Sequence, residues 1–306
     1  MRWMASTVLA LAGATLAHAG AAAIAAEAGE AALRAPEAGT ALWIGADHQH
    51  AGEYPFSLAL GDAGDDSAAA PWLGRELRVY ADGQARGRAR PLRRIAGSDL
   101  GCSEPDRLAF APGDEAPALG EHGAWLADFD LNPEQRLQRR AATAAEREEL
   151  LAELVAMAVP GRVERPQRLR QAVAQWRRDG EAAGRRELWL VADARAPQRR
   201  WALLTLDAEF DAGADDARER IGAVALFARE ADDRGWRRRA WVSTASCADC
   251  EGMEPRHQAL DFADLDRDGA PDFLFEVQQY ESWSHRLLRS GGEGGSWQAL
   301  DGGGGC

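Results

Sequence analysis

Short apolar runs separated by turn-forming residues occupy the first part of the chain after residue 40. The runs are short and partly alternating, and Gly, Pro and Asp lie between them, as is typical of β-strands joined by turns. Four runs carry the pattern: 42–44, 56–60, 77–80 and 125–129. We therefore predict a β-rich segment over residues 41–131.

The pattern changes to helical spacing after residue 131. Asn132 is a good N-cap, Pro133 suits the first helical position and Gln135 lies three residues after the cap, which together form a capping-box start. Apolar residues then recur at intervals of three, four and seven: Leu137, Ala141, Ala144, Leu151, Val155 and Ala158. The pair Pro160 and Gly161 ends this predicted helix.

A second helix is predicted from Pro166 to Gly180. Leu169, Val173 and Trp176 fall on one face, and glycine commonly follows the end of a helix. The two helices would form a hairpin over residues 132–184. An apolar stripe of this kind is more typical of core or partner packing than of a cofactor site.

Strand patterns return from residue 187 onward. Ladder-forming residues dominate six runs: 188–191, 201–210, 221–227, 238–242, 273–277 and 283–288. Hairpin-like breaks lie between runs, so we expect a mainly antiparallel domain over residues 185–306. The predicted fold class is α+β, mainly β.

The N-terminus reads as a secretory signal peptide over residues 1–19. Arg2 supplies a charged start, an apolar stretch follows, and Ala17-His18-Ala19 matches an A-x-A cleavage site before Gly20. An uncleaved anchor is the alternative. Residues 20–40 are rich in Ala, Gly and Glu, which predicts a flexible leader. We expect the protein in the periplasm or outside the cell.

Charge and hydropathy limit the possible partners. The formal net charge is -13, whereas a protein that neutralises phosphates normally carries a positive surface, so we expect no nucleic-acid partner. No run after the signal peptide approaches about 18 apolar residues, so we expect no transmembrane segment in the mature chain.

Four cysteines fit an oxidising compartment and allow three disulfide pairings: Cys102, Cys247, Cys250 and Cys306. We favour a local bridge between Cys247 and Cys250 together with one from Cys102 to Cys306. A redox role for the C-x-x-C motif is disfavoured because Asp249 and neighbouring carboxylates would raise a thiolate's pKa. A zinc site is disfavoured because a second ligand pair at zinc spacing is missing.

An aspartate-rich stretch near the C-terminus carries the clearest chemistry. Asp264, Asp266 and Asp268 alternate, Gly269 permits a sharp turn, and Asp272 stands at the ninth position, where a direct or water-mediated ligand belongs. Carboxylates about 5 Å apart repel by a few kcal/mol per pair at an effective dielectric of about 20. A hard divalent cation removes that repulsion, and the spacing suits the flexible coordination of Ca²⁺ better than the octahedron of Mg²⁺.

The stretch differs from an EF-hand because Phe275 occupies position twelve and the residues after Asp272 alternate as on a strand. Residues 259–278 resemble the calcium loop of FG-GAP or VCBS-type repeats, which occur in integrin-like propellers and secreted bacterial proteins. The resemblance implies calcium ligation by Asp264, Asp266, Asp268 and Asp272 with the carbonyl of Ala270. Such families usually carry tandem copies and this chain has one, so we expect no full propeller. An Asp-rich turn held by hydrogen bonds alone is the alternative.

Other polar clusters are weaker metal candidates. A second acidic cluster comprises Asp207, Glu209, Asp211, Asp215 and Asp216, but Gly213 is one place late for the turn, and a strand entering a loop explains the segment. His48 and His50 lack a nameable third ligand and fit an exposed loop. His122, His257 and His285 are expected to be hydrogen-bonded structural residues.

Two functional hypotheses follow. The first is a secreted or periplasmic calcium-binding, β-rich, non-enzymatic protein with a structural role or a protein or glycan partner at the cell surface. Five aromatic residues could supply a recognition surface, although most are expected in the core: Trp189, Trp201, Trp241, Trp283 and Tyr280. The second is a secreted, glycosidase-like hydrolase whose catalytic carboxylates are dispersed along the chain.

Overall fold

A computed structural model describes residues 39–46, 52–60, 72–97, 105–110, 116–180, 185–211, 218–247, 255–279, 281–291 and 295–305. The predicted signal peptide and almost all of the leader lie outside these ranges. So do several residues singled out above: His48, His50, Cys102, Asp215, Asp216, Cys250, Tyr280 and Cys306. Cys247 ends a strand, and the predicted disulfides stay predictions.

The described residues are mostly β-sheet, with two α-helices, which confirms the predicted α+β, mainly β class. The strands are β1 (Ala41–Gly45), β2 (Glu53–Leu60), β3 (Leu77–Ala81), β4 (Gln84–Ala89), β5 (Pro91–Ile95), β6 (Arg107–Phe110), β7 (Gly123–Ala127), β8 (Leu137–Arg140), β9 (Arg186–Asp193), β10 (Arg200–Asp211), β11 (Arg218–Arg229), β12 (Arg237–Cys247), β13 (Arg256–Ala263), β14 (Asp272–Gln278), β15 (Ser282–Arg289) and β16 (Ser296–Gly305). The helices are α1 (Ala144–Met157) and α2 (Pro166–Asp179).

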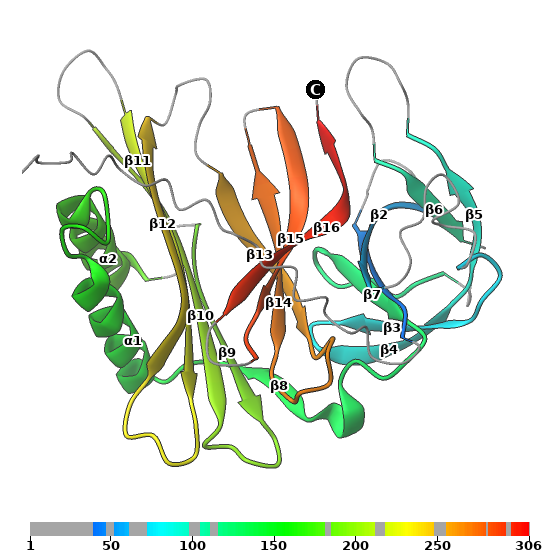
Figure 1. Ribbon diagram of the computed structural model, residues 1–306, viewed down its shortest axis with the longest axis horizontal. Helices are drawn as coiled ribbons and strands as arrows, with labels where there is room; N and C mark the ends of the chain where they lie inside the picture. The colour runs from blue at the N-terminus through cyan, green and yellow to red at the C-terminus, as the bar shows by residue number, and fades with distance from the viewer. Residues whose placement is uncertain are drawn as a thin grey trace, which may run out of the picture. The chain divides into compact units, whose positions relative to one another are not determined.

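The strands form two antiparallel sheets, drawn in Figure 1. The smaller sheet has the order β12-β11-β10-β9-β8. The larger follows the order β13-β14-β15-β16-β2-β1-β7-β3-β4, and β6 pairs with β2 and β5 beside it. Strands from residues 185–306 therefore contribute to both sheets, and β16 meets the N-terminal strand β2 through Asp301 and Leu58.

The first helix begins later than the sequence pattern predicted. A 3₁₀ turn covers Pro133–Gln135, residues from Leu137 form strand β8, and α1 starts after Thr143. The predicted N-cap Asn132 makes tertiary contacts instead, because its side-chain amide donates to the carbonyls of Gly83 and Leu137 and accepts from the Leu137 amide. The helix from 132 was therefore a wrong prediction.

The true start of α1 is a capping box one segment further along the chain. The Thr143 hydroxyl accepts from the Glu146 backbone amide at 3.2 Å, and the Glu146 carboxylate accepts from the Thr143 amide at 2.9 Å. The second helix was predicted correctly: α2 begins at Pro166, buries Leu169, Val173 and Trp176, and ends before Gly180.

The molecule is layered around the five-stranded sheet. Both helices cover one face of that sheet, and strands β13 to β15 pack on its other face, as Figure 1 shows. Strand β10 shows the cause in its alternation. Ala202, Leu204 and Leu206 share a core with the helices, whereas Trp201 and Leu203 share a core with the larger sheet.

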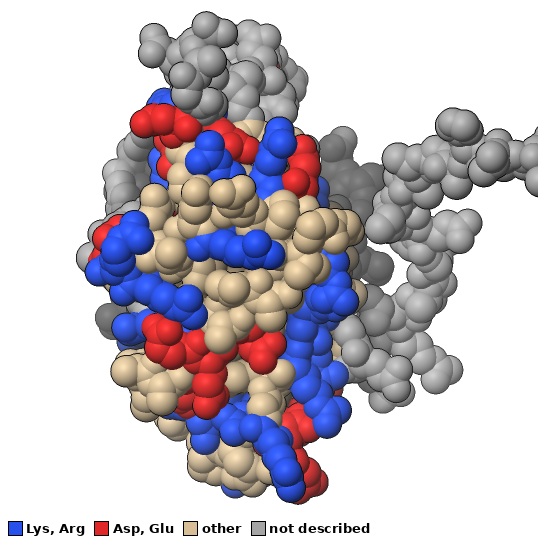
Figure 2. Space-filling model, turned by 90° about the vertical axis from the view of Figure 1, so that its left-hand side faces the viewer, with Lys and Arg blue, Asp and Glu red and all other residues tan. Residues whose placement is uncertain are grey.

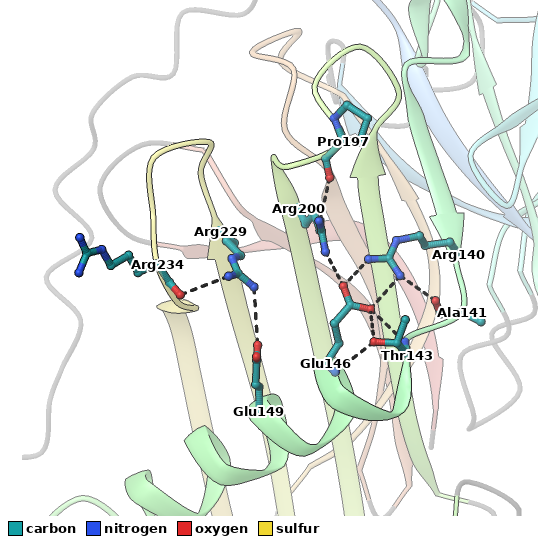
Figure 3. Close-up of polar contacts among 9 residues, drawn as sticks. All are labelled: Arg140, Ala141, Thr143, Glu146, Glu149, Pro197, Arg200, Arg229 and Arg234. Carbon is teal, nitrogen blue, oxygen red and sulfur yellow. Dashed lines mark hydrogen bonds and ion pairs between the residues drawn. The ribbon is translucent and has the colours of Figure 1, made fainter.

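Ion pairs connect α1 to the five-stranded sheet. The buried Glu146 carboxylate receives Arg140 from the residues before the helix and Arg200 from β10, as Figure 3 shows. The Arg140 hydrogen bonds lower the Glu146 pKa to about 2, although burial acts in the opposite direction. Farther along α1, Glu149 pairs with Arg229 at 3.6 Å.

The helix-bearing side carries charges of both signs. Figure 2 shows basic and acidic side chains interspersed there, with patches of other residues between them. Arg177 of α2, for example, pairs with Glu148 of α1 at 3.0 Å. Since opposite charges neutralise each other locally, this side offers no extended field of one sign.

Candidate metal centre

The aspartate-rich motif forms the connection between β13 and β14. The two strands pair with Ala263 opposite Asp272, so residues 264–271 close the hairpin. Arg267 and Gly269 have left-handed backbone angles, with φ of 62° and 79°. The turn thus uses glycine where the motif predicted it, and the guanidinium of Arg267 lies over the Phe129 ring.

Three carboxylates converge inside this turn. Asp264, Asp266 and Asp268 each offer one oxygen, and the three oxygens lie within 4.8 Å of one another. In the described part of the chain, this group can hold a metal ion, as the alternating spacing predicted. We call these three residues the aspartate triad.

The turn's backbone uses one oxygen of each triad carboxylate and fixes its direction. Asp264 Oδ2 accepts from the Gly269 amide at 3.0 Å, Asp268 Oδ1 from the Ala270 amide at 2.7 Å, and Asp266 Oδ1 from the Asp268 amide at 3.3 Å. These bonds leave one oxygen of each residue outside the backbone network.

The free oxygen of Asp264 is the most informative atom of the site. Asp264 is 5% exposed, and its Oδ1 is buried without a hydrogen-bond partner among the described residues. A buried carboxylate oxygen with no partner is costly, because it has lost water without gaining a donor. A cation bound to the triad would provide the missing interaction.

The triad is electrostatically strained without a counter-ion. Burial, followed by the charges of Asp268 and Asp266, raises the Asp264 pKa to about 7. The pKa of Asp268 is raised by burial and by Asp266. At 4.8 Å two carboxylates repel by about 1 kcal/mol in water and about 3 kcal/mol at an effective dielectric of about 20.

Asp272 lies at the base of the turn and makes different contacts. Its Oδ2 accepts from the Leu265 amide at 3.0 Å and from Arg289 Nη1 at 3.1 Å, and the side chain is buried. Burial raises its pKa, and Arg289 opposes that rise. The Ala270 amide donates a hydrogen bond to Asp268. Among the described residues, the group of carboxylates that can hold a metal ion comprises only the aspartate triad, so ligation by Asp272 and by the Ala270 carbonyl stays a prediction.

Residues distant in sequence enclose the loop. Arg289 lies 3.7 Å from Asp266, and Arg136, held by Asp193 at 2.6 Å, packs over Gly269. A Cβ on Gly291 would fall 2.1 Å from Asp268 Oδ2, so the chain after β15 closes tightly over the triad. The sequence pattern gave no signal for these neighbours, because each belongs to a different segment.

Asp261 belongs to the motif's sequence but not to the triad. It is buried on β13 and accepts hydrogen bonds from the backbone amides of Phe262 at 2.7 Å and Asp82 at 3.2 Å. Burial raises its pKa to about 8. Asp261 therefore ties the β3–β4 turn to β13.

Asp207 and Glu209, two of the described members of the second acidic cluster, pair with arginine. Asp207 accepts from Arg220 at 2.8 Å, and Glu209 accepts from Arg185 at 2.7 Å and from Arg218 at 3.0 Å. The strand interpretation of this segment agrees with β10, which runs through Asp211.

Two of the structural histidine candidates have lowered pKa values; His285 is buried and His257 is half-buried. His285 Nδ1 lies 2.7 Å from the Ser57 hydroxyl, and burial lowers the His285 pKa to about 4. Burial also lowers the pKa of His257 to about 4, where the ring packs against Phe275 and Trp297. Both imidazoles are therefore neutral at pH 7.

Comparison with known proteins adds no relative. No protein-family model, curated protein or solved structure matches this chain. The resemblance to FG-GAP and VCBS-type loops therefore rests on the loop residues alone. Neither described helix has the length and apolar character needed to cross a bilayer.

Proposed function

We propose that the aspartate triad binds Ca²⁺ and that the protein is a calcium-stabilised, non-enzymatic binding or structural protein of the periplasm or cell exterior. The observation that carries the metal proposal is Asp264 Oδ1, a buried carboxylate oxygen without a partner beside two further carboxylates. An all-oxygen donor set suits Ca²⁺ or Mg²⁺ rather than zinc, which prefers nitrogen and sulfur. Ca²⁺ is favoured because alternating carboxylates in a turn suit its flexible, high coordination better than the octahedron that Mg²⁺ requires.

The position of the loop explains what the ion would stabilise. The β13–β14 hairpin lies between two cores: Phe273 and Phe275 face the five-stranded sheet, whereas Leu265 and Leu274 face the N-terminal strands. Fixing the turn with a cation would hold both sets of side chains in register. Calcium is therefore proposed as a structural ion that stabilises the centre of the fold.

The predicted signal peptide and the proposed calcium site are compatible with the same location. Extracellular calcium modules bind with dissociation constants of about 0.1–1 mM, and such weak sites fill only where calcium is abundant. A chain exported by the predicted signal peptide would meet that condition. The binding or structural role is proposed on the exported location, the β-rich fold and this site.

Thermal unfolding of the chain starting at Gly20 tests the metal proposal. We expect EDTA to lower the melting temperature, Ca²⁺ to raise it and Mg²⁺ to raise it less, with about 2.7 kcal/mol gained at 100 times the dissociation constant. An Asp266→Ala/Asp268→Ala variant should lose the response. The matched control is Asp232→Ala, an exposed carboxylate in the β11–β12 turn that should keep it. Equal melting temperatures in EDTA and Ca²⁺ for the wild-type chain would refute the proposal.

A further inference from the structure

Strand β10 changes character along one face but not along the other. The residues that face the helices stay apolar from Ala202 through Leu204 and Leu206 to Ala208. The opposite face begins with Trp201 and Leu203, continues with Thr205 and Asp207, and reaches Glu209 two residues later. Polar groups thus replace apolar ones at positions that face another sheet, where a continued core would call for apolar residues.

A cavity of about 230 Å³ lies where this face turns polar. Glu187 of β9, Thr205 and Asp207 line it from the five-stranded sheet, and Arg256 and Gln258 line it from β13. Glu187 and Thr205 are direct partners in the β9–β10 ladder. Because Arg256 pairs with Gln278 at the open end of the β13–β14 hairpin, the cavity lies at the end remote from the aspartate triad.

Two residues of the cavity wall, Glu187 and Arg256, each carry a polar atom without a hydrogen bond, although Arg256 forms ion pairs with Asp207 and Glu209. Glu187 Oε2 and Arg256 Nε are buried without hydrogen-bond partners among the described residues. Burial raises the Glu187 pKa and lowers that of Arg256. Arg256 stands 3.8 Å from Asp207, which is too long for a hydrogen bond. The wall of the cavity therefore offers hydrogen-bond acceptors, from Glu187 and Asp207, and donors, from Arg256 and Gln258.

A second cavity of about 370 Å³ adjoins the first through a shared residue. Gln258 lines both, and the second cavity adds Trp283, His285, Glu121 and Glu276. Trp283 is half-buried, with its ring 5.1 Å from that of His285. Of the aromatic residues considered for recognition, Trp189 and Trp201 are buried, whereas Trp283 borders an open space.

We propose that the paired cavities bind a neutral carbohydrate, with one sugar unit beside Glu187 and the next beside Trp283. A hydroxyl group both donates and accepts, so sugar hydroxyls match the mixed acceptors and donors that line the first cavity. The flat apolar face of a sugar ring matches an indole. The first cavity has the volume of about eight water molecules at roughly 30 Å³ each, which accommodates one sugar ring.

Charge balance favours a neutral ligand over an ionic one. Arg185 and Arg256 on the wall of the first cavity are matched by Asp207 and Glu187. A strongly charged ligand would face like charge on one side of this cavity. The inference rests on the proposed binding role and deepens it by naming the ligand class, but its site is separate from the metal loop.

Isothermal titration with maltotriose, cellotriose, chitotriose and mannotriose, with glycerol as the simple polyol, tests the proposal in the presence of Ca²⁺. We expect at least one trisaccharide to bind and glycerol to give no saturable signal. Glu187→Gln and Trp283→Ala should each weaken binding by roughly tenfold or more. Glu148→Gln, an exposed change on α1, should leave it unchanged. Melting curves with and without Ca²⁺ would show that each variant is folded.

Two results would overturn the carbohydrate site. One is the absence of saturable binding of all four trisaccharides to wild-type protein whose melting curve shows it folded. The other is binding that neither Glu187→Gln nor Trp283→Ala weakens. Neither result bears on the calcium proposal. That proposal fails if Ca²⁺ does not raise the melting temperature in the same melting curves. Release of reducing sugar that Glu187→Gln and Asp207→Asn abolish would support the carbohydrate site and replace the non-enzymatic role with hydrolysis.

Discussion

Arg289 donates a hydrogen bond from Nη1 to Oδ2 of Asp272 at 3.1 Å, and both side chains are buried. The same guanidinium stands 3.7 Å from Asp266 of the aspartate triad. Arg289 thus supplies positive charge at the base of the loop that is proposed to bind a cation. If the triad binds Ca²⁺ as proposed, a cation from solution adds to the positive charge that Arg289 of β15 already supplies to the loop.

Replacing Arg289 tests how far the Arg289 guanidinium and the proposed Ca²⁺ each stabilise the loop. Arg289→Met should destabilise the protein by about 3–5 kcal/mol in EDTA, because it leaves the buried Asp272 without its partner. Ca²⁺ should restore part of that loss by offsetting the charge of the triad nearby. Urea unfolding with and without Ca²⁺ measures both effects. Arg237→Met, which changes a largely exposed arginine, is the control, and a loss identical in EDTA and Ca²⁺ would contradict the shared role.

Asp268→Asn should change the sign of its effect when calcium is added. The amide oxygen can still accept from the Ala270 amide, but one negative charge is removed from the triad. In EDTA the variant should be more stable than wild type by roughly 0.5–1 kcal/mol, because like-charge repulsion falls. In Ca²⁺ it should be less stable, because a charged ligand is lost. Paired melting curves check both arms, with Asp232→Asn as the exposed control, and a variant less stable in both solutions would argue against a repulsive apo loop.

The triad was predictable because its geometry is local. Asp264, Asp266 and Asp268 lie within five residues and need only one turn to converge. Arg289, Arg136 and Gly291 were not predictable, because they reach the loop through the sheet order. The same limit applies to the proposed carbohydrate site, where Glu187 and Arg256 meet only when the two sheets pack.

The helical segment shows how a tertiary contact can override a local capping signal. Asn132 and Thr143 each begin a plausible capping sequence, and only Thr143 is free to cap. Asn132 is occupied by the backbone of Gly83, a contact 49 residues away that no local pattern reveals. The strand at 201–210 was predicted from its apolar residues. The polar residues on its other face could be interpreted only once the structure placed β13 opposite them.

Glu146 should stabilise α1 in a pH-dependent manner. Its folded pKa of about 2 lies below the ordinary 4.5, so its contribution is present above pH 4.5 and is lost as pH falls through 2. Glu146→Gln should therefore cost up to about 3 kcal/mol at pH 7 and much less near pH 2. Urea unfolding across this range measures the difference. Glu148→Gln on the exposed side of the helix should show no such dependence, and an equal cost at both pH values would rule out the ion pairs as the cause.

Asp261 should impose the opposite pH dependence. Its folded pKa of about 8 lies above the ordinary 3.8, so the unfolded chain releases this proton first and the group's contribution to stability declines as pH rises from about 4 through 8. Asp261→Asn cannot ionise, so its stability should fall less steeply between pH 5 and pH 9 than that of wild type. The comparison concerns the slope, because the amide also loses one acceptor for the Asp82 or Phe262 backbone. The free energy of unfolding is measured against pH in Ca²⁺ and in EDTA, with Asp232→Asn as the control. Parallel curves for wild type and Asp261→Asn would show that the pKa of this buried carboxyl does not change on folding.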